Sequence, residues 1–144
     1  MTQNVAQLIE DLRLEDPAVF ICGDFNSRWG SEVTQFMNNR KDSLPNALPD
    51  LHSAYDYFLR HLFRTDDEKQ LEKALSLYHT QFTHELKCHI DYIWFSNHNT
   101  QVREVLELLE EEKILVSCGV SLPSKYYSSD HVALLATFKM PNIQ

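Results

Sequence analysis

The sequence of 144 residues is poor in the residues that break regular structure, with only three glycines and five prolines. It contains no internal repeat, and 43% of its residues are hydrophobic, which excludes collagen-like, low-complexity and disordered proteins. No apolar run approaches the ~20 residues that a membrane-spanning helix needs. Residues 1–4 lack the basic and apolar regions of a signal peptide. We therefore expect one globular domain without a membrane partner.

Cysteine and positive charge are also scarce. Cys22, Cys88 and Cys118 are odd in number, far apart and set in apolar surroundings, which favours reduced thiols over disulfides. We expect an intracellular, cytoplasmic protein, with the nucleus and the mitochondrion left open. There are 13 basic residues against 21 acidic ones, a formal net charge of -8. Such a chain cannot bind nucleic acid only by neutralising the phosphate backbone of the nucleic acid. The carboxylates of the protein suit a divalent cation.

The apolar pattern predicts a layered α/β or α+β domain. Helices are expected at 3–14, at 32–39 after the N-cap Ser31, and from Asp66 and Asp67 through Tyr78; strands are expected at 18–22, 88–96 and 132–138, and a loop at 40–50. Segment 51–63 stays unassigned, and the pattern of 101–112 fits a helix or a strand. The acidic run Glu110–Glu112 is interpreted as a solvated surface.

The stretch Gly23–Ser27 follows a short apolar run, which predicts a buried strand that stops at Gly23. Asp24 and Asn26 lie two residues apart, so in an extended backbone their side chains point the same way. Together they offer an acceptor for a metal ion or a proton and a donor for an anionic oxygen. Taken alone, the same residues also fit a turn in which Asp and Asn bond their own backbone.

Asp91 interrupts the apolar strand expected at 88–96, on the face that carries Ile93 and Phe95. A buried carboxylate without a partner is costly, so Asp91 requires a donor. His131, immediately before the last apolar strand, is the candidate. We predict that the Asp91 carboxylate lies about 2.6–3.2 Å from an imidazole nitrogen of His131. The charge of the carboxylate should raise the pKa of this imidazole.

Asp24 and Asn26 are expected to open onto the same cleft as this pair. An imidazolium held by a carboxylate can stabilise charge on a phosphate oxygen. Asp24 could then orient or deprotonate the attacking water, and Asn26 could donate to the same phosphate. A second cluster matches no strong zinc-binding spacing and is interpreted as a coincidence. It comprises His79, His84, Cys88 and His89.

Three motifs occur in order: Gly-Asp-Phe-Asn-Ser at 23–27, Ile-Asp-Tyr-Ile-Trp-Phe-Ser at 90–96, and Ser-Ser-Asp-His-Val-Ala-Leu-Leu-Ala at 128–136. With these motifs the chain resembles the endonuclease/exonuclease/phosphatase superfamily. Within it, the chain is similar to the branch of the carbon-catabolite-repressor-type deadenylases, nocturnin and the Angel proteins. The segment from Val105 to His131 is most similar to the Angel group. The resemblance implies the C-terminal half of a four-layered α/β sandwich, with a mixed, mostly antiparallel sheet flanked by helices.

The resemblance also implies a role for each residue of the candidate site. Asp24 would contact the nucleophilic water or a metal, and Asn26 would contact the scissile phosphate. Asp91 would orient His131, which touches the phosphate. Asp130 would help to bind Mg²⁺, for which Mn²⁺ could substitute. The implied activity is metal-dependent hydrolysis of phosphoester bonds in RNA or a nucleotide, as a deadenylase-like 3′-exonuclease, an RNA-end phosphatase or a hydrolase of a nucleotide cofactor.

Two features of the family have no counterpart in this sequence: the Gln-Glu motif, whose Glu is the principal metal ligand, and the central Asn-Thr-His strand. We therefore expect residues 1–144 to form a partial domain that lacks the N-terminal half. Half a sandwich leaves an apolar sheet face uncovered. A fragment, a gene-model or splice product, a degenerate descendant and a piece that pairs with another chain all stay open. The second function hypothesis is an inactive interaction module that needs a complementary or homologous chain.

Overall fold

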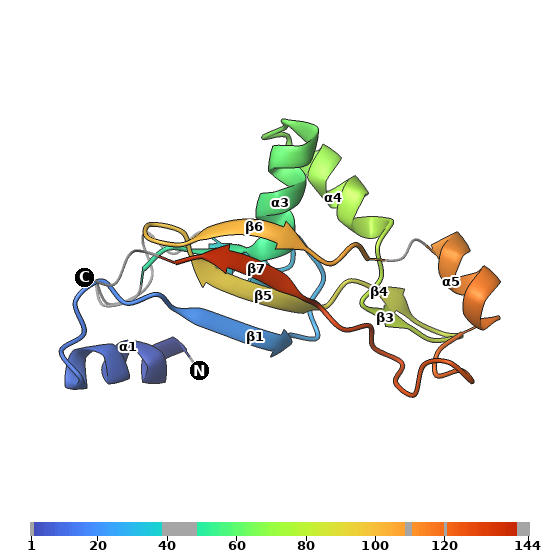
Figure 1. The fold of residues 1–144 in the computed structure, drawn as a ribbon, viewed down its shortest axis with the longest axis horizontal. Coiled ribbons are helices and arrows are strands. Elements are labelled where there is room, and N and C mark those ends of the chain that lie inside the picture. Colours follow the sequence, from blue (N-terminus) through green and yellow to red (C-terminus); the bar gives the residue numbers. More distant parts are fainter. Residues whose placement is uncertain (1, 39–48, 109–110, 120, 141–144) are drawn as a thin grey trace.

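The structure is a computed structural model that describes residues 2–38, 49–108, 111–119 and 121–140. Helices and antiparallel strands are interspersed along the chain (Figure 1). Their order is α1 (Thr2–Asp11), β1 (Phe20–Asp24), α2 (Glu32–Asn38), β2 (Leu51–Ser53), α3 (Ala54–Phe63), α4 (Glu68–Ser76), β3 (Gln81–Phe82), β4 (Lys87–Cys88), β5 (Asp91–Ser96), β6 (Gln101–Val105), α5 (Glu111–Cys118) and β7 (Ala136–Lys139).

The fold is organised around a three-stranded antiparallel sheet in the order β1-β5-β2, with β5 at its centre (Figure 1). The register of β1 on β5 pairs Ile21 with Trp94 and Asp24 with Asp91. Two further ribbons, β3-β4 and β6-β7, are also antiparallel. An antiparallel sheet flanked by helices confirms the predicted fold class.

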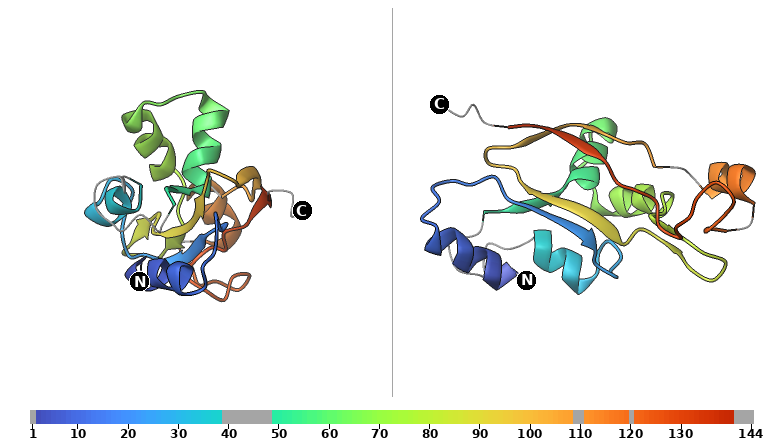
Figure 2. Two further views of the ribbon diagram at one scale, coloured as in Figure 1. Left: turned by 90° about the vertical axis from the view of Figure 1, so that its left-hand side faces the viewer. Right: turned by 60° about the horizontal axis from the view of Figure 1, so that its bottom comes forward.

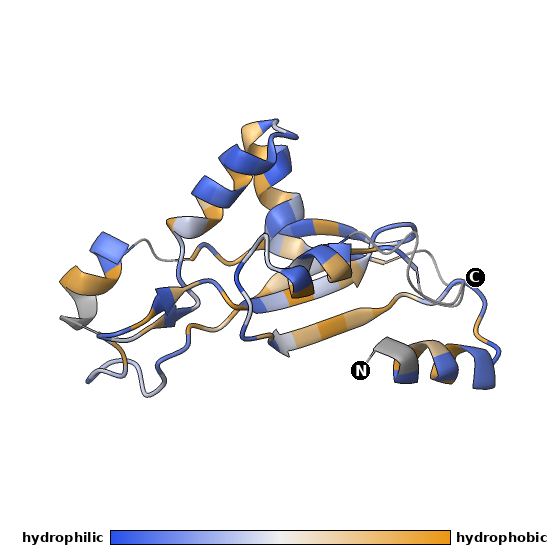
Figure 3. Cartoon of the chain, turned by 180° about the vertical axis from the view of Figure 1, so that it is seen from behind, coloured by the Kyte–Doolittle hydropathy of each residue, from blue (hydrophilic) through white to orange (hydrophobic). Residues whose placement is uncertain are grey.

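The two faces of the sheet are covered by different elements. Helices α1 and α2 lie along one face, where Ile9 and Met37 pack with Tyr92 and Trp94 of β5 (Figure 2). On the other face Phe95 packs against the start of α3 and the β6-β7 ribbon. This division confirms the alternation predicted along β5. Figure 3 shows apolar residues along much of β1, one of the two edge strands of the sheet.

The predicted helices are present, with shorter ends. Ser31 caps α2 by accepting a hydrogen bond from the Thr34 N–H at 3.4 Å, and Asp67 caps α4 by accepting one from Lys69 N–H at 2.9 Å. The helix expected at 3–14 ends at Asp11, because Arg13 adopts a left-handed conformation with φ 51°. No helix among the described residues is long and apolar enough to cross a bilayer.

The first predicted strand was placed too early, and the prediction that it is buried was wrong, because only Ile21 of β1 is buried. It was expected to stop at Gly23, but β1 continues through Asp24, and the Phe25 N–H then donates to the Ile90 carbonyl at 2.9 Å. Gly23 does not end the strand because it adopts φ 151°, which leaves it in the ladder opposite Tyr92.

The strand predicted at 88–96 is divided. The Thr80 hydroxyl accepts hydrogen bonds from Ile90 N–H at 3.0 Å and Asp91 N–H at 3.1 Å, so a side chain takes the place of a strand partner between β4 and β5. The strand predicted at 132–138 likewise begins only at Ala136. There the Tyr55 hydroxyl accepts from Leu135 N–H at 3.2 Å.

The segments left open are now resolved. Residues 51–63 form β2 and α3, and the first part of 101–112 is strand β6. Helix α5 was not predicted. Its residue Glu111 contacts Lys87 and His79, so the acidic run is not solely a solvated surface. Glu110 and most of the loop predicted at 40–50 lie outside the described residues.

Candidate active site

Asp24 is placed by the end of β1 and by the turn that follows it. Its Oδ1 accepts the Asn26 backbone N–H at 2.7 Å, and its Oδ2 accepts the Asn26 amide Nδ2–H at 3.3 Å. Asn26 has φ 49°, a left-handed conformation that Asn tolerates better than most residues. The turn and the paired side chains therefore coexist, although the backbone is not extended as the functional interpretation assumed. Both side chains are exposed.

Asp91 begins β5 directly opposite Asp24 in the antiparallel ladder. This register brings two carboxylates from distant parts of the chain to the same end of the sheet. The Asp91 backbone is held by Thr80, and its side chain is 17% exposed. The placement explains how an acid can interrupt an apolar strand: it stands at the strand end, where solvent reaches it.

His131 meets Asp91 as predicted, with its Nδ1 2.9 Å from the Asp91 Oδ2. A carboxylate only accepts, so Nδ1 carries the proton and Nε2 is left for other partners. Partial burial alone would lower the pKa of His131, but the hydrogen bond and the charge of Asp91, with Asp130 and Asp24 beyond, outweigh it and raise the pKa. The imidazolium is therefore favoured at this position.

Asp24, Asp91 and His131 form one compact group, in which ligand atoms from all three lie within 4.8 Å of one another. Carboxylate oxygens are the ligands that Mg²⁺ and Mn²⁺ prefer. The hydrogen bonds from Asn26 and His131 leave each carboxylate with free lone pairs. The residues present therefore fit a small divalent cation that keeps several of its waters.

Asp130 lies beside this group and faces a different partner. Its Oδ2 accepts from Gln81 Nε2 at 3.2 Å, and this hydrogen bond lowers the pKa of the carboxyl. The backbone supports the same arrangement, since Phe82 N–H donates to the Asp130 carbonyl at 3.0 Å. Asp130 is not a member of the three-residue group, and its role in binding metal stays a prediction.

Three contributors to this region carry no signal in the sequence. Thr80 and Gln81 contact residues that follow ten to fifty positions later, which periodicity cannot reveal. Arg28, just after the first motif, lines a small cavity together with Cys88. Tertiary contacts between segments that are distant in the sequence bring these side chains together.

The histidine and cysteine cluster does not form a zinc site among the described residues, whose one group of three possible ligands is the acidic group above. His89 is buried, and burial lowers its pKa to about 4. Both of its ring nitrogens lack a hydrogen-bond partner within the described part of the chain. The interpretation of this cluster as a coincidence stays a prediction.

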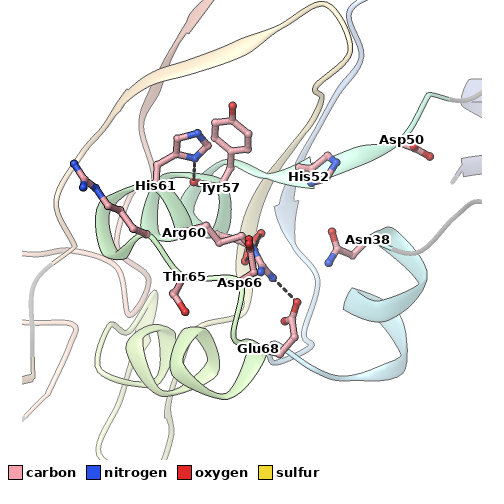
Figure 4. A pocket seen from close by; sticks show the side chains of 11 residues that line it. Asn38, Asp50, His52, Tyr57, Arg60, His61, Thr65, Asp66 and Glu68 are labelled. Carbon is pink, nitrogen blue, oxygen red and sulfur yellow. Dashed lines mark hydrogen bonds and ion pairs between the residues drawn. The ribbon is translucent and has the colours of Figure 1, made fainter.

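A wide, open cavity of about 1160 Å³ lies elsewhere, between α3, α4 and β2 (Figure 4). Charged side chains dominate its lining, among them Arg60, whose Nη2 lies 2.5 Å from Glu68 Oε1. No residue of the acidic group lines it. Its lining holds four acidic side chains, Asp50, Asp56, Asp66 and Glu68, against Arg60 and Arg64, so it disfavours an anionic ligand.

Comparison with known proteins agrees with this geometry. The chain is 32% identical over 129 residues to the Ccr4 subunit of Schizosaccharomyces pombe, described as a CCR4-Not complex 3′-5′-exoribonuclease subunit; the match covers 85% of the chain and 18% of that protein. It is 31% identical over 138 residues to human nocturnin, covering 96% of the chain and 27% of that protein. The chain thus spans less than a third of the length of these relatives. Placement in the Angel group stays a prediction.

The fold comparison gives the same result. The solved catalytic domain of human nocturnin with a bound sulfate anion superposes with a TM-score of 0.57 and 26% identity, over 96% of this chain and 37% of that one. Residues 2–131 match the sequence pattern of the Endonuclease/Exonuclease/phosphatase family, and this range contains Asp24, Asp91 and His131. The chain therefore belongs to the Endonuclease/Exonuclease/phosphatase family.

Proposed function

We propose that this chain carries the C-terminal half of a Mg²⁺-dependent phosphoester hydrolase of RNA-processing type, with Mn²⁺ as a possible substitute. One observation carries the proposal: the 2.9 Å contact between His131 Nδ1 and Asp91 Oδ2, with an oxygen of Asp24 in the same compact group. A carboxylate-held imidazolium beside a second carboxylate combines a charge stabiliser with a proton acceptor.

His131 and Asp91 act as one unit in this proposal. Asp91 fixes the ring so that the Nε2–H is directed away from the pair, and it keeps the imidazole charged. The Nε2–H then donates to a non-bridging oxygen of the phosphate and stabilises the negative charge that grows there as water attacks. The proton stays on the ring throughout this step.

Asp24 and Asn26 act on the other side of the phosphate. Asp24 accepts a proton from the attacking water or orients it, because its oxygens retain lone pairs after the two bonds from Asn26. The Asn26 amide has a second N–H, which can donate to the phosphate. Because Asn26 is fixed to Asp24, the donor and the base move together.

The metal ion would be held by Asp24 and Asp91, with Asp130 as a further carboxylate nearby. When bound, it would polarise the phosphoryl oxygen and lower the pKa of a coordinated water. Two carboxylates hold Mg²⁺ weakly, so a further ligand from a complementary segment would strengthen the site.

RNA is the proposed substrate class because Ccr4 is described as an exoribonuclease subunit. An intracellular, cytoplasmic location suits this substrate, and it also suits the free thiols of Cys22 and Cys88. The chemistry of the group does not distinguish 3′-exonuclease from end phosphatase action. Both cleave a phosphoester by attack of water.

The test is hydrolysis of single-stranded oligoadenylate RNA, and of the same RNA ending in a 2′,3′-cyclic phosphate, with and without Mg²⁺. We expect Mg²⁺-dependent hydrolysis that Asp24→Ala and His131→Ala reduce by about 100-fold or more. Asp66→Ala and His98→Ala, which change exposed residues outside the group, serve as matched controls. Undiminished activity in the Asp24 and His131 variants would refute the assignment. The preferred RNA end identifies the reaction.

A second candidate function is a non-catalytic module that pairs with a complementary or homologous chain. It is favoured by Phe20 and Leu135, apolar side chains that are 39% and 59% exposed on and beside the strands. Light scattering and Mg²⁺ calorimetry separate the two functions. Self-association without Mg²⁺ binding supports the module, whereas tight Mg²⁺ binding by the isolated chain contradicts it.

A further inference from the structure

A smaller cavity of about 260 Å³ lies between the end of α4, strand β4 and the loop after the first motif (Figure 1 shows these elements). It is lined by Arg28, Trp29, Glu72, Leu75, Ser76, His79, Lys87, Cys88 and His89. Ligand cavities for drug-sized molecules begin at about 300 Å³. This one is therefore sized for a single ring system rather than for a chain of several nucleotides.

The walls of this cavity combine aromatic and apolar surface with neutral polar groups. Trp29 stacks on Trp94 with an interplanar angle of 13°, which fixes the Trp29 ring as a rigid wall. The Trp29 ring also packs against the apolar cluster of Leu59, Leu71 and Leu75, and Leu75 lines the cavity beside it. A flat ring can lie against the part of Trp29 that lines the cavity, because stacking on an aromatic side chain is favourable for every base.

Two buried histidines supply the polar part. His79 and His89 are 8% and 5% exposed, and the Nδ1 of His79 and both ring nitrogens of His89 have no hydrogen-bond partner in the described part of the chain. Burial lowers the pKa of His79 despite the opposing charge of Glu111, so its ring offers one donor and one acceptor at neutral pH. A ring with its own donors and acceptors would supply the missing partners.

Charge divides the cavity into an interior and a mouth. The Lys87 ammonium is bound to Glu111 Oε1 at 2.5 Å and lies over the Phe82 ring, so it is already neutralised. Glu72 disfavours an anion inside the cavity. Arg28 is exposed and lines the same cavity, so its guanidinium can meet a ligand at the mouth.

The mouth lies toward the acidic group. Cys88 lines the cavity and its thiol donates to Gln81 Oε1 at 3.7 Å, while Gln81 Nε2 donates to Asp130, the neighbour of His131, at 3.2 Å. A ligand with a neutral ring in the cavity and a phosphate on Arg28 would thus extend toward the proposed site of hydrolysis. A nucleotide has this distribution of charge.

We propose that this cavity is a nucleobase pocket, in which a base lies against Trp29 beside His79 and His89 while its phosphate contacts Arg28. The pocket rests on the proposed function for its direction, since it gives the hydrolase a place for the base next to the scissile phosphate. It is a binding site in its own right, so it can be tested without metal and without catalysis.

The test is calorimetry of the full chain in metal-free buffer with three probes: AMP, adenosine and ribose 5-phosphate. We expect AMP to bind at least about tenfold more tightly than ribose 5-phosphate, because the base fills the cavity. AMP should quench the fluorescence of Trp29, and Trp29→Phe should remove this signal. Arg28→Ala should lower the affinity for AMP by about fivefold and leave the affinity for adenosine within about twofold of its original value.

A matched pair of variants on α4 locates the binding. Ser76 is exposed and lines the cavity, whereas Lys73 is exposed on the same helix and does not. Ser76→Phe should obstruct the cavity and weaken AMP by about tenfold or more, and Lys73→Phe should leave it within about twofold. Equal effects of the two variants would overturn the pocket. So would equal affinity for AMP and ribose 5-phosphate, or no binding of AMP at millimolar concentration.

The two proposals fail in different ways. Asp24→Asn should abolish hydrolysis, whereas Ser76→Phe should weaken metal-free AMP binding. If AMP binds but no RNA substrate is hydrolysed, the proposed pocket is supported and the proposed hydrolase function is refuted. If RNA is hydrolysed and Ser76→Phe leaves the KM unchanged, the hydrolase function is supported and the proposed pocket is refuted.

Discussion

Two carboxylate–cation pairs in this molecule have similar contact distances and different surroundings. Asp56 and Arg60 are four residues apart on α3, and the Asp56 side chain is 2% exposed, with both oxygens accepting from Arg60 Nε at 3.0 and 3.2 Å. Asp91 and His131 are 40 residues apart in the sequence, and their side chains are 17% and 28% exposed.

The difference separates a structural pair from a reactive one. The pair on α3 forms with its helix, and its cation does not titrate near neutral pH. The pair at the sheet end forms only when distant segments meet, and its cation titrates near neutral pH and reaches solvent. The pair that suits proton chemistry is thus the one that is less buried and costs more chain entropy to assemble.

The sharpest way to break the comparison is Asp91→Asn. We expect the rate of RNA hydrolysis in Mg²⁺ to fall by about 100-fold or more, because the ring loses both its orientation and its stabilised charge. The thermal midpoint should change little, since the side chain stands at a strand end. Arg60→Leu is the comparison: its folded fraction should keep full specific activity. A similar loss of activity in both variants would remove the distinction.

The second prediction concerns the structural pair and measures how Arg60→Leu changes the free energy of unfolding. Removing the guanidinium leaves the buried Asp56 carboxylate unpaired, which should lower the free energy of unfolding by about 3–5 kcal/mol. Urea denaturation at pH 7 measures this loss. Arg103→Leu changes an exposed residue of β6 and should cost under about 0.5 kcal/mol. Equal costs would show that the α3 pair is not structural.

The pH dependence of stability should reveal the same buried carboxyl. Burial raises the pKa of Asp56 to about 6, and the Arg60 charge only partly offsets this. Between pH 4 and 6 the folded chain keeps a proton that the unfolded chain has released, so stability falls as pH rises. This carboxyl should account for about 3 kcal/mol of that fall. Asp56→Asn should flatten the slope in urea titrations over this range, and an unchanged slope would contradict the assignment.

The titration of His131 tests the pair that it forms with Asp91 at the end of the sheet. Its raised pKa means that the charged ring stabilises the fold fully below the pKa of an unfolded histidine, and that this stabilisation is lost as pH rises through the folded pKa. NMR titration of the imidazole should show a pKa above the ordinary value. Asp91→Asn should lower it, and Asp56→Asn should not. A His131 pKa that is unchanged by Asp91→Asn would contradict the contact between the two side chains.

The smallest expected effect concerns the rim of the α3 pair. Glu68 extends the network to Arg60 at 2.5 Å, but its side chain is 64% exposed. Glu68→Gln should cost under about 0.5 kcal/mol, because solvent screens exposed ion pairs. Urea denaturation with and without added salt checks this value. A loss comparable with that of Arg60→Leu would mean that the network, and not the buried carboxylate, supplies the stability.

The sequence predicted those features that depend on local pattern or on chemical need. The caps Ser31 and Asp67 follow from their positions before apolar runs. The contact between Asp91 and His131 follows from the cost of an unpaired acid in an apolar strand. Both arguments use only the residue and its neighbours, which the sequence provides.

Strand ends and the surroundings of the site could not be predicted in the same way. Where β5 and β7 begin is decided by the hydroxyls of Thr80 and Tyr55, which come from segments far away in the sequence. The turn at Asn26 combines two interpretations that the sequence presented as alternatives. The contact of Asp130 with Gln81 depends on the β3-β4 hairpin, which the sequence did not predict as a separate unit.

Thr80 has a consequence for how sequence variants of this chain are interpreted. Its hydroxyl accepts from two backbone N–H groups at the start of β5, and its carbonyl accepts from Val132 N–H at 2.7 Å, next to His131. A change such as Thr80→Val would keep the size of the side chain and remove the acceptor. In a saturation mutagenesis screen, this buried position would therefore have the tolerance profile of a catalytic residue, although its hydroxyl is occupied by backbone N–H groups.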